Sequence, residues 1–230
     1  MTVMFKTAES DRRFVFFDVD DTLISVKSML SFQEYWYRTR SDKEGEIRYR
    51  DDLQKHMHEH ACWNFLNRLY YRHFAGRCEL DVTRMGREWF AWARAQPDFY
   101  HAPVVEELRT HQRAGREAVF VSGSFHAVLK PIADELGVRR ILCTRLEVVN
   151  GQYTGEIRPP QTIGDGKVEA VQQFLAQQGV PAQACDAYGD DLSDLPMLKA
   201  VGKAVVVGGG RGLVPYAQEY GWRVVQPALV

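Results

Sequence analysis

The 230-residue chain lacks long hydrophobic runs and lacks a strong excess of charge of either sign. No apolar stretch approaches the roughly 20 residues that a transmembrane helix needs. The first residues, MTVMFKTAESDRR, contain no hydrophobic segment of the signal-peptide kind. A formal net charge of −1 offers no basic surface for nucleic acid. We therefore expect a cytoplasmic protein that has neither a membrane nor a nucleic acid as its partner.

Cysteine is scarce as well, and its spacing argues against a disulfide framework. The four cysteines lie far apart in the sequence and form no Cys-x-x-Cys pair. Free thiols in a reducing compartment are the ordinary state of cysteines spaced in this way. We expect that state for Cys62, Cys78, Cys143 and Cys185.

The most informative segment that is present is FVFFDVDDTL, residues 14–23, in which an apolar strand pattern ends in aspartates. Asp18, Asp20 and Asp21 fall within four positions. In an open parallel sheet, ligands bind at the carboxyl ends of the strands, so Asp18 and Asp20 are placed to meet a substrate and a divalent metal. Aspartate is also common in turns, and a polar turn after a buried strand would explain this segment alone equally well.

Three further segments follow in a fixed order, and each comes after an apolar strand pattern or begins a helix pattern. VFVSGS places Ser122 and Gly123 at the end of a second strand. DGKVEAV places Lys167 in the first turn of a helix. AYGDDLSDLPML follows another strand pattern and contains Asp190, Asp191 and Asp194.

The set of DVDDT, SGS, lysine and GDDLSD motifs resembles the four motifs of the haloacid dehalogenase (HAD) superfamily, and nearly the whole chain fits that plan. The closer resemblance is to its phosphoserine-phosphatase-like branch, subfamily IB, which has the same Ser-Gly pair. This resemblance implies an α/β fold, with a Rossmann-like parallel sheet as the core and an inserted helical-bundle cap of the C1 type.

The pattern of elements predicts a matching division of the chain. Residues 14–24, and residues from about 100 onward, alternate short β-branched strands with helical stretches, as in a parallel sheet. Between 25 and 99 helical stretches follow one another, and four of the five tryptophans lie there. We predict a HAD-like core domain from residues 1–24 and 100–230 and a helical cap domain from residues 25–99. Asn-Gly in NGQYTGEI, residues 150–157, predicts a small hairpin.

The resemblance implies a magnesium site at the ends of the strands. Asp18 corresponds to the nucleophile and to a Mg²⁺ ligand, Asp190 to the second carboxylate ligand, and the backbone carbonyl of Asp20 to a third oxygen. Hard oxygen ligands of this kind are those that Mg²⁺ prefers. Asp194 corresponds to a second acid, which supports the metal-bound waters or Lys167.

The remaining motif residues correspond to acid–base and phosphate-binding groups. The Asp20 side chain would protonate the leaving alkoxide and later accept a proton from the attacking water. This second aspartate favours a phosphatase, because dehalogenases lack it and ion-pumping ATPases carry threonine there. Ser122 and Gly123 would hold the phosphoryl oxygens, while Lys167 offsets charge on the phosphate and on Asp18. For Asp191 we expect a solvated acid in a tight turn.

Two cap positions bear on substrate specificity. The resembled branch has a glutamate nine residues after the nucleophile, where it reads the ammonium group of phosphoserine, and here Lys27 occupies that position. A lysine cannot pair with an ammonium and favours a second anionic group on the substrate. The carboxylate-reading arginine of the branch falls on Arg87, with Arg84 as the alternative register. A solvated helix face explains either arginine as well.

These observations predict a Mg²⁺-dependent phosphatase that hydrolyses a small-molecule phosphomonoester through an aspartyl-phosphate on Asp18. The substrate is expected to carry a second anionic group and not to be phosphoserine. One alternative is a phosphotransferase that uses the same aspartyl-phosphate, because donor and acceptor would meet the same residues. A binding protein that retains the fold is a further alternative, but all four motifs are intact.

Overall fold

The computed structural model describes residues 14–58 and 62–227, and at its centre these residues form a seven-stranded sheet. The strand order is β4-β3-β2-β1-β5-β6-β7, and only the edge pair β3–β4 is antiparallel. This confirms the predicted α/β fold with a mostly parallel sheet. The strands are β1 (Phe14–Phe17), β2 (Glu117–Phe125), β3 (Arg140–Val149), β4 (Gln152–Arg158), β5 (Asp186–Asp191), β6 (Lys203–Arg211) and β7 (Arg223–Val225).

The helices of the sheet region begin and end where local sequence favours it. Pro103 stands at the start of α5, where its missing N–H costs no hydrogen bond. Gly179 and Gly221 adopt the left-handed conformation that ends α7 and α9. These helices are α5 (Ala102–Arg113), α6 (His126–Glu135), α7 (Asp165–Gln178), α8 (Leu195–Ala200) and α9 (Val214–Tyr220), with the short 3-10 turns η2 (Ala182–Ala184) and η3 (Leu192–Asp194).

Strand β1 lies in the middle of the sheet, and its alternating side chains belong to two different cores. Phe16 packs edge-on against Phe174 of α7, on one face of the sheet. Phe17 belongs to the larger core on the other face, which also contains Phe32. All of β1 is buried, as expected for a parallel strand covered on both faces. The strand that carries the first aspartate motif is therefore held rigidly.

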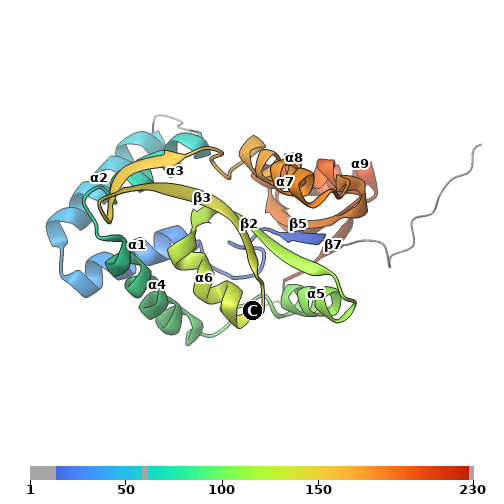
Figure 1. The fold of residues 1–230 in the computed structure, drawn as a ribbon, viewed down its shortest axis with the longest axis horizontal. Coiled ribbons are helices and arrows are strands. Elements are labelled where there is room, and N and C mark those ends of the chain that lie inside the picture. The colour runs from blue at the N-terminus through green and yellow to red at the C-terminus, as the bar shows by residue number, and fades with distance from the viewer. Residues whose placement is uncertain (1–13, 59–61, 228–230) are drawn as a thin grey trace, which may run out of the picture.

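Between β1 and α5 the chain forms α1 (Ser28–Arg40), α2 (Lys43–His58), α3 (Trp63–Arg72) and α4 (Glu79–Arg94). Figure 1 shows these helices gathered on one side of the molecule, away from α7, α8 and α9. Trp89 of α4 is fully buried and donates a hydrogen bond from its indole N–H to Ser31 Oγ at 3.0 Å. The assignment of residues 25–99 as a separate cap domain stays a prediction.

The hairpin formed by β3 and β4 connects the sheet to these helices. Its turn residues Asn150 and Gly151 both have positive φ, as the predicted Asn-Gly turn requires, so the predicted hairpin is confirmed. The backbone of the hairpin also bonds to the segment after α3: Gly76 N–H donates to Tyr153 O at 2.8 Å, and Tyr153 N–H to Arg77 O at 3.0 Å. Figure 1 shows the hairpin extending from the sheet across to α3. Within the described ranges, every helix is too short or too polar to span a bilayer.

Candidate active site

The site forms where three adjacent parallel strands end. β1 pairs with β2 on one side and with β5 on the other. Asp18 follows β1 directly, Ser122 lies in the second half of β2, and Asp190 lies near the end of β5. Asp18 N–H donates to the carbonyl of Tyr188 at 3.0 Å, which continues the pairing of β1 with β5 up to the aspartate. Sheet order thus brings Asp18 together with Ser122 and Asp190, each more than one hundred residues away from it in the sequence.

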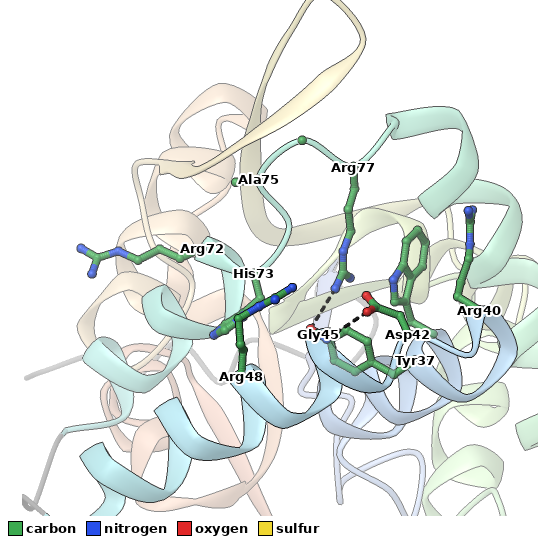
Figure 2. Close-up of a pocket in the computed structure, with 11 residues that line it drawn as sticks. Tyr37, Arg40, Asp42, Gly45, Arg48, Arg72, His73, Ala75 and Arg77 are labelled. Atoms are coloured by element: carbon green, nitrogen blue, oxygen red, sulfur yellow. Dashed lines mark hydrogen bonds between the residues drawn. The ribbon is translucent and has the colours of Figure 1, made fainter.

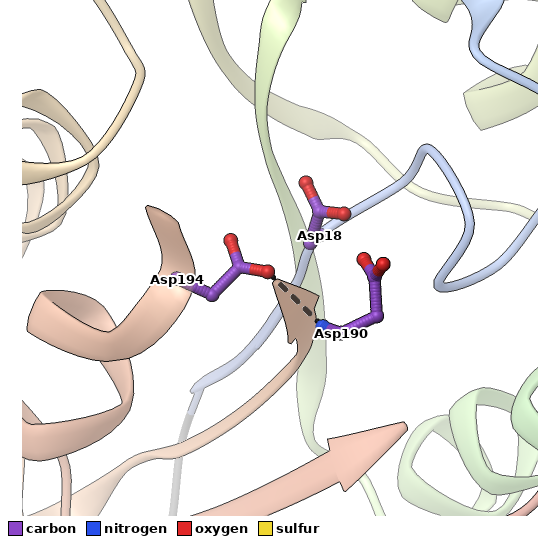
Figure 3. Close-up of side chains that lie close together, drawn as sticks. All are labelled: Asp18, Asp190 and Asp194. Atoms are coloured by element: carbon purple, nitrogen blue, oxygen red, sulfur yellow. Dashed lines mark hydrogen bonds between the residues drawn. The ribbon is translucent and has the colours of Figure 1, made fainter. Parts of the chain in front are cut away.

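Three carboxylates cluster at this edge of the sheet (Figure 3). Asp18, Asp190 and Asp194 each offer an oxygen, and these oxygens all lie within 4.8 Å of one another. All three residues are buried. Burial, together with the charges of Asp18 and Asp194, raises the pKa of Asp190 above its usual range. The three buried carboxylates therefore repel one another, and the cluster needs a positive charge nearby to offset this repulsion.

Lys167, from the first turn of α7, supplies a positive charge to this cluster. Its Nζ lies 2.5 Å from an oxygen of Asp18 and 2.5 Å from an oxygen of Asp194. The other oxygen of Asp194 accepts hydrogen bonds from the backbone N–H groups of Asp190 at 3.0 Å and Asp191 at 3.2 Å. Both oxygens of Asp194 are thus already engaged with protein groups, so Asp194 supports the lysine and the strand end.

Close packing around Asp194 depends on Gly189. A Cβ built on Gly189 would lie 2.6 Å from the Cβ of Asp194, which is closer than real carbon atoms approach. Asp191 caps the following turn, because its carboxylate accepts a hydrogen bond from Ser193 N–H at 2.9 Å. The expectation for Asp191 as a turn residue agrees with this contact.

The Ser-Gly motif lies beside the carboxylates and is almost completely buried. Ser122 is 1% exposed, and its hydroxyl oxygen accepts a hydrogen bond from Ser124 N–H at 3.0 Å. The hydroxyl proton of Ser122 is therefore available for a hydrogen bond to a bound anion. A Cβ on Gly123 would lie 2.5 Å from a side-chain carbon of Ile163, so only glycine fits at this position without displacing the isoleucine.

Asp20 differs from Asp18 in its surroundings. Burial, and next the negative charge of Asp18, raise the pKa of Asp20 to about 7. One of its carboxylate oxygens is buried and has no hydrogen-bond partner in the described structure. A carboxyl group in such a place is readily kept protonated near neutral pH. Asp18, by contrast, contacts the ammonium group of Lys167.

Lys27 lies at the edge of the same site, immediately before α1. Its ammonium group forms an ion pair with Asp21 at 3.1 Å, and 41% of its side chain is exposed. Burial alone would lower the pKa of Lys27, but the carboxylates of Asp21, Asp18, Asp190 and Asp20 together raise it. Lys27 thus lies within the electrostatic reach of the site carboxylates, and its role in substrate specificity stays a prediction.

Arg87 is different, because it lies on an exposed face of α4. No contact between Arg87 and the clustered aspartates is found in the described part of the chain. Arg84, the alternative register, forms ion pairs with Asp81 at 3.2 Å and with Glu88 at 3.4 Å on the surface of its own helix. A role for Arg87 in substrate recognition stays a prediction.

Sequence reasoning missed several residues that position the site. Thr22 donates its hydroxyl to Asp190 at 2.9 Å and is fully buried. The carbonyl of Gly123 accepts hydrogen bonds from Asn67 at 3.0 Å and from Tyr71 at 2.8 Å, both from α3. Asn67 and Tyr71 are four residues apart, which places them on the same face of a helix. Nothing in the sequence, however, predicts that this face contacts the Ser-Gly motif.

The residues at the site are chemically suited to a hard divalent cation. Among the described residues, Lys167 forms ion pairs with two of the three clustered carboxylates, those of Asp18 and Asp194. Buried carboxylates in such excess are costly unless a cation offsets them. The oxygens of Asp18 and Asp190 are of the kind that Mg²⁺ binds. Asp18, Asp190 and the neighbouring backbone could therefore hold a magnesium ion.

Comparison with known proteins agrees with this geometry. The family of haloacid dehalogenase-like hydrolases matches residues 15–199. Phosphoserine phosphatases occur among both the curated relatives and the solved structures that match. The chain therefore belongs to the haloacid dehalogenase-like hydrolase family, and its relatives include proteins named as phosphatases.

Individual relatives match over nearly the whole chain. A probable phosphatase of Mycobacterium tuberculosis (strain ATCC 25618 / H37Rv) is 32% identical, over 95% of this chain and 77% of its own length. A histidinol-phosphatase of Neisseria meningitidis serogroup C (strain 8013) is 26% identical, over 91% of this chain and 96% of its own. The crystal structure of a protein of unknown function from Bordetella pertussis Tohama I is similar with a TM-score of 0.82 and 27% identity, covering 93% and 98% of the two chains.

Proposed function

We propose that this protein is a Mg²⁺-dependent phosphatase that hydrolyses a small-molecule phosphomonoester through an aspartyl-phosphate on Asp18. The observation that carries the proposal is the contact of Lys167 with both Asp18 and Asp194, beside a second carboxyl group at Asp20. A lysine held in this way lowers the repulsion between a carboxylate nucleophile and a phosphate. Two carboxyl groups in different environments can then act as nucleophile and as acid.

In the first step, an oxygen of Asp18 attacks phosphorus and forms an acyl phosphate, while the bond from phosphorus to the ester oxygen breaks. Asp20 donates its proton to the departing alkoxide. In the second step, Asp20 takes a proton from a water molecule that attacks the same phosphorus, and Asp18 leaves as a carboxylate. The products are an alcohol and inorganic phosphate. The reaction is thereby divided into two displacements, each with a lower barrier.

Mg²⁺ would be held by Asp18, Asp190 and the backbone carbonyl of Asp20. When bound, it would offset the charge of the phosphate dianion. Thr22 orients Asp190 for this purpose, and Asp194 holds Lys167 and the end of β5 in place. The Ser122 hydroxyl and the N–H of Gly123 would bind the phosphoryl oxygens.

We further propose that the substrate carries a second anionic group, which Lys27 binds. The position of Lys27 among the site carboxylates supports this role, since it can turn from Asp21 toward a substrate anion. The relative named histidinol-phosphatase indicates a competing possibility, because histidinol phosphate carries an ammonium group in place of a second anion. A comparison of cationic with anionic substrates therefore decides between these two specificities.

The test is phosphate release from a panel of phosphomonoesters, with Mg²⁺ or with EDTA. The panel contains esters with a carboxylate or a second phosphate, together with phosphoserine, histidinol phosphate and an uncharged alcohol phosphate. We expect Mg²⁺-dependent release, highest for the esters with a second anionic group. Release from no member of the panel would contradict the phosphatase proposal, and preference for histidinol phosphate would contradict the role of Lys27.

The covalent step is tested with Asp18→Asn. We expect at least a thousandfold loss of kcat, because an amide is a poor nucleophile. Asp98→Asn is the matched control, since Asp98 lies on an exposed loop. Circular dichroism of both variants checks the fold. Turnover by Asp18→Asn near that of the wild type would exclude Asp18 as the nucleophile.

A further inference from the structure

A second pocket lies in the helical region, at the far end of α1 from Ser28. It has a volume of about 600 Å³ and lies between the end of α1, the start of α2 and the segment that follows α3. Figure 2 shows its lining, which is rich in positive charge. Four arginines contribute, namely Arg40, Arg48, Arg72 and Arg77.

Asp42 is the one acidic residue in the lining of this pocket, and it is already engaged. Its carboxylate accepts a hydrogen bond from Gly45 N–H at 2.9 Å, in the first turn of α2. Its backbone carbonyl accepts from Glu46 N–H at 3.0 Å. Asp42 thus begins α2, and no ion pair between Asp42 and a pocket arginine occurs among the residues that the structure describes.

Arg77 is the central cation of the pocket, and its partners are neutral. Its guanidinium donates to Gln33 Oε1 at 3.0 Å and to the hydroxyl of Tyr37 at 3.2 Å, and it lies 4.4 Å from the ring centre of Trp36. Figure 2 shows the guanidinium directed toward Tyr37. Burial lowers the pKa of Arg77 from its usual range. The charge of Asp42 opposes this lowering, but Arg77 forms no ion pair with a carboxylate among the described residues. A half-buried guanidinium in this position attracts an anion more strongly than one exposed to water.

Two further arginines at this pocket are available to a ligand. Arg72 forms no ion pair within the described ranges of the chain. Arg48 forms only a loose pair with Glu44, at 3.9 Å, with both side chains largely exposed. Exposed pairs of this kind contribute little energy and are readily replaced. Arg40 is more firmly held, by Asp81 at 3.1 Å and by the face of Trp36.

We propose that this pocket is a second binding site, which takes a small organic anion with two or more negative charges. A pocket of about 600 Å³ is of the size that holds a metabolite. Guanidinium groups bind carboxylate and phosphate oxygens through paired N–H donors, so a polycarboxylate or a phosphate ester matches the lining. The partly desolvated Arg77 would provide the central contact, with Arg48 and Arg72 closing on the ligand from the rim.

This pocket is separate from the candidate active site. α1 begins at Ser28, which bonds to Ser124 next to the Ser-Gly motif, and ends at Arg40 in the pocket. A helix of 13 residues spans roughly 20 Å, so a ligand in the pocket would not touch Asp18. Changes at the pocket rim can therefore be made without altering the residues of the proposed reaction.

The proposal is tested by calorimetric titration of the full chain with tricarballylate, a tricarboxylate that carries no phosphate and cannot be turned over. We expect one binding site with a dissociation constant in the millimolar range or below. Arg48→Glu and Arg72→Glu should each weaken binding at least tenfold. Arg50→Glu is the matched control, because Arg50 lies on the same helix as Arg48 and pairs with Glu46 outside the pocket. It should change the dissociation constant less than twofold.

Asp18→Asn separates this site from the candidate active site, and we expect it to bind tricarballylate like the wild type. A dissociation constant that changes more than threefold in either direction in Asp18→Asn would place the probe in the active site and overturn the proposal. Absence of binding to the wild type, or equal binding by Arg48→Glu and Arg72→Glu, would overturn it as well. Arg77→Gln should also lose binding. If that variant fails to fold, the two rim variants still decide the question.

Discussion

Asp194 illustrates how a single side chain joins several parts of the candidate site. One of its oxygens contacts Lys167, and the other accepts two backbone N–H groups at the end of β5. Burial raises the pKa of Asp194, although the charge of Lys167 acts against this. Its position under the strand end means that Asp194 fixes the lysine relative to Asp18 and Asp190. Figure 3 shows the carboxylates of Asp18 and Asp190 side by side at the strand ends, and an oxygen of each lies within 4.8 Å of the other.

Lys27 provides a test of specificity at a single side chain. We expect Lys27→Gln to raise KM about tenfold for esters with a second anionic group, since a charged hydrogen bond contributes roughly 1 to 3 kcal/mol. KM for an ester without that group should change little. Lys130→Gln serves as the control, because Lys130 pairs with Asp134 on the surface of α6. An equal effect of Lys27→Gln on both kinds of ester would show that Lys27 does not select the substrate.

Helix α4 is attached to the sheet region through its contact with α6. The two helices approach closely at Gly86, where a Cβ would lie 2.2 Å from the carbonyl oxygen of Ala127. A side chain at this position would push the two helices apart. The hairpin β3–β4 makes a second connection, by its backbone bonds to the segment after α3. The helices between β1 and α5 are therefore bound to the sheet region at more than one point.

We expect Gly86→Ala to lower the free energy of unfolding by roughly 1 to 3 kcal/mol, as in other overpacked sites. The sign of this change in unfolding free energy is informative, because alanine in place of glycine within a helix otherwise stabilises the helix by about 1 kcal/mol. Urea denaturation measures the difference. Arg87→Ala, at the neighbouring exposed position, should change stability by less than about 0.5 kcal/mol. A stabilised Gly86→Ala variant would show that α4 and α6 have room to separate.

At the scale of the whole molecule, a partly buried polar network joins the sheet to α5. His111 Nε2 lies 2.8 Å from the hydroxyl of Tyr188, which donates to Glu107 at 2.9 Å. Arg223 of β7 pairs with the same Glu107 at 2.7 Å. Tyr188 also stacks on Phe17 of β1, with ring centres 4.4 Å apart. This network joins α5, β5 and β7 to the strand that ends in Asp18.

The network predicts a loss of stability in mild acid. Burial, and next the charge of Arg116, lower the pKa of His111 to about 4, whereas Asp186 and Glu107 oppose this effect. The unfolded chain binds a proton at His111 near pH 6.5, so the folded state loses stability as pH falls from 6.5 toward 4. We expect the His111 contribution to this loss to be roughly 1 to 3 kcal/mol.

Denaturation of the wild type and of His111→Gln across this pH range measures the effect. The glutamine variant retains a group that can hydrogen-bond to Tyr188 but does not titrate. Its unfolding free energy should fall less steeply between pH 6.5 and 4. Parallel curves for the two proteins would show that His111 takes up its proton in the folded state as readily as in the unfolded chain.

Much of the fold and of the candidate site could be predicted from short segments. Asp18, Ser122 and Asp190 each end an apolar strand pattern, and parallel pairing places such ends at one edge of a sheet. Lys167 opens a helix that points to the same edge. These predictions depend only on local sequence and on the general geometry of parallel sheets. The order of the motifs along the chain was therefore sufficient to make them.

Contacts made by the helices between β1 and α5 could not be predicted in the same way. Asn67 and Tyr71 reach the carbonyl of Gly123, while Arg87, chosen by motif register, lies on an exposed surface. The arginine pocket likewise requires the ends of α1 and α3 to meet. Amino-acid order alone determined the sheet and the clustering of the motif residues at its edge, because strands and their end positions follow local patterns. Tertiary packing decided which helix faces meet the site and the pocket, because many distant contacts set the rotation of each helix.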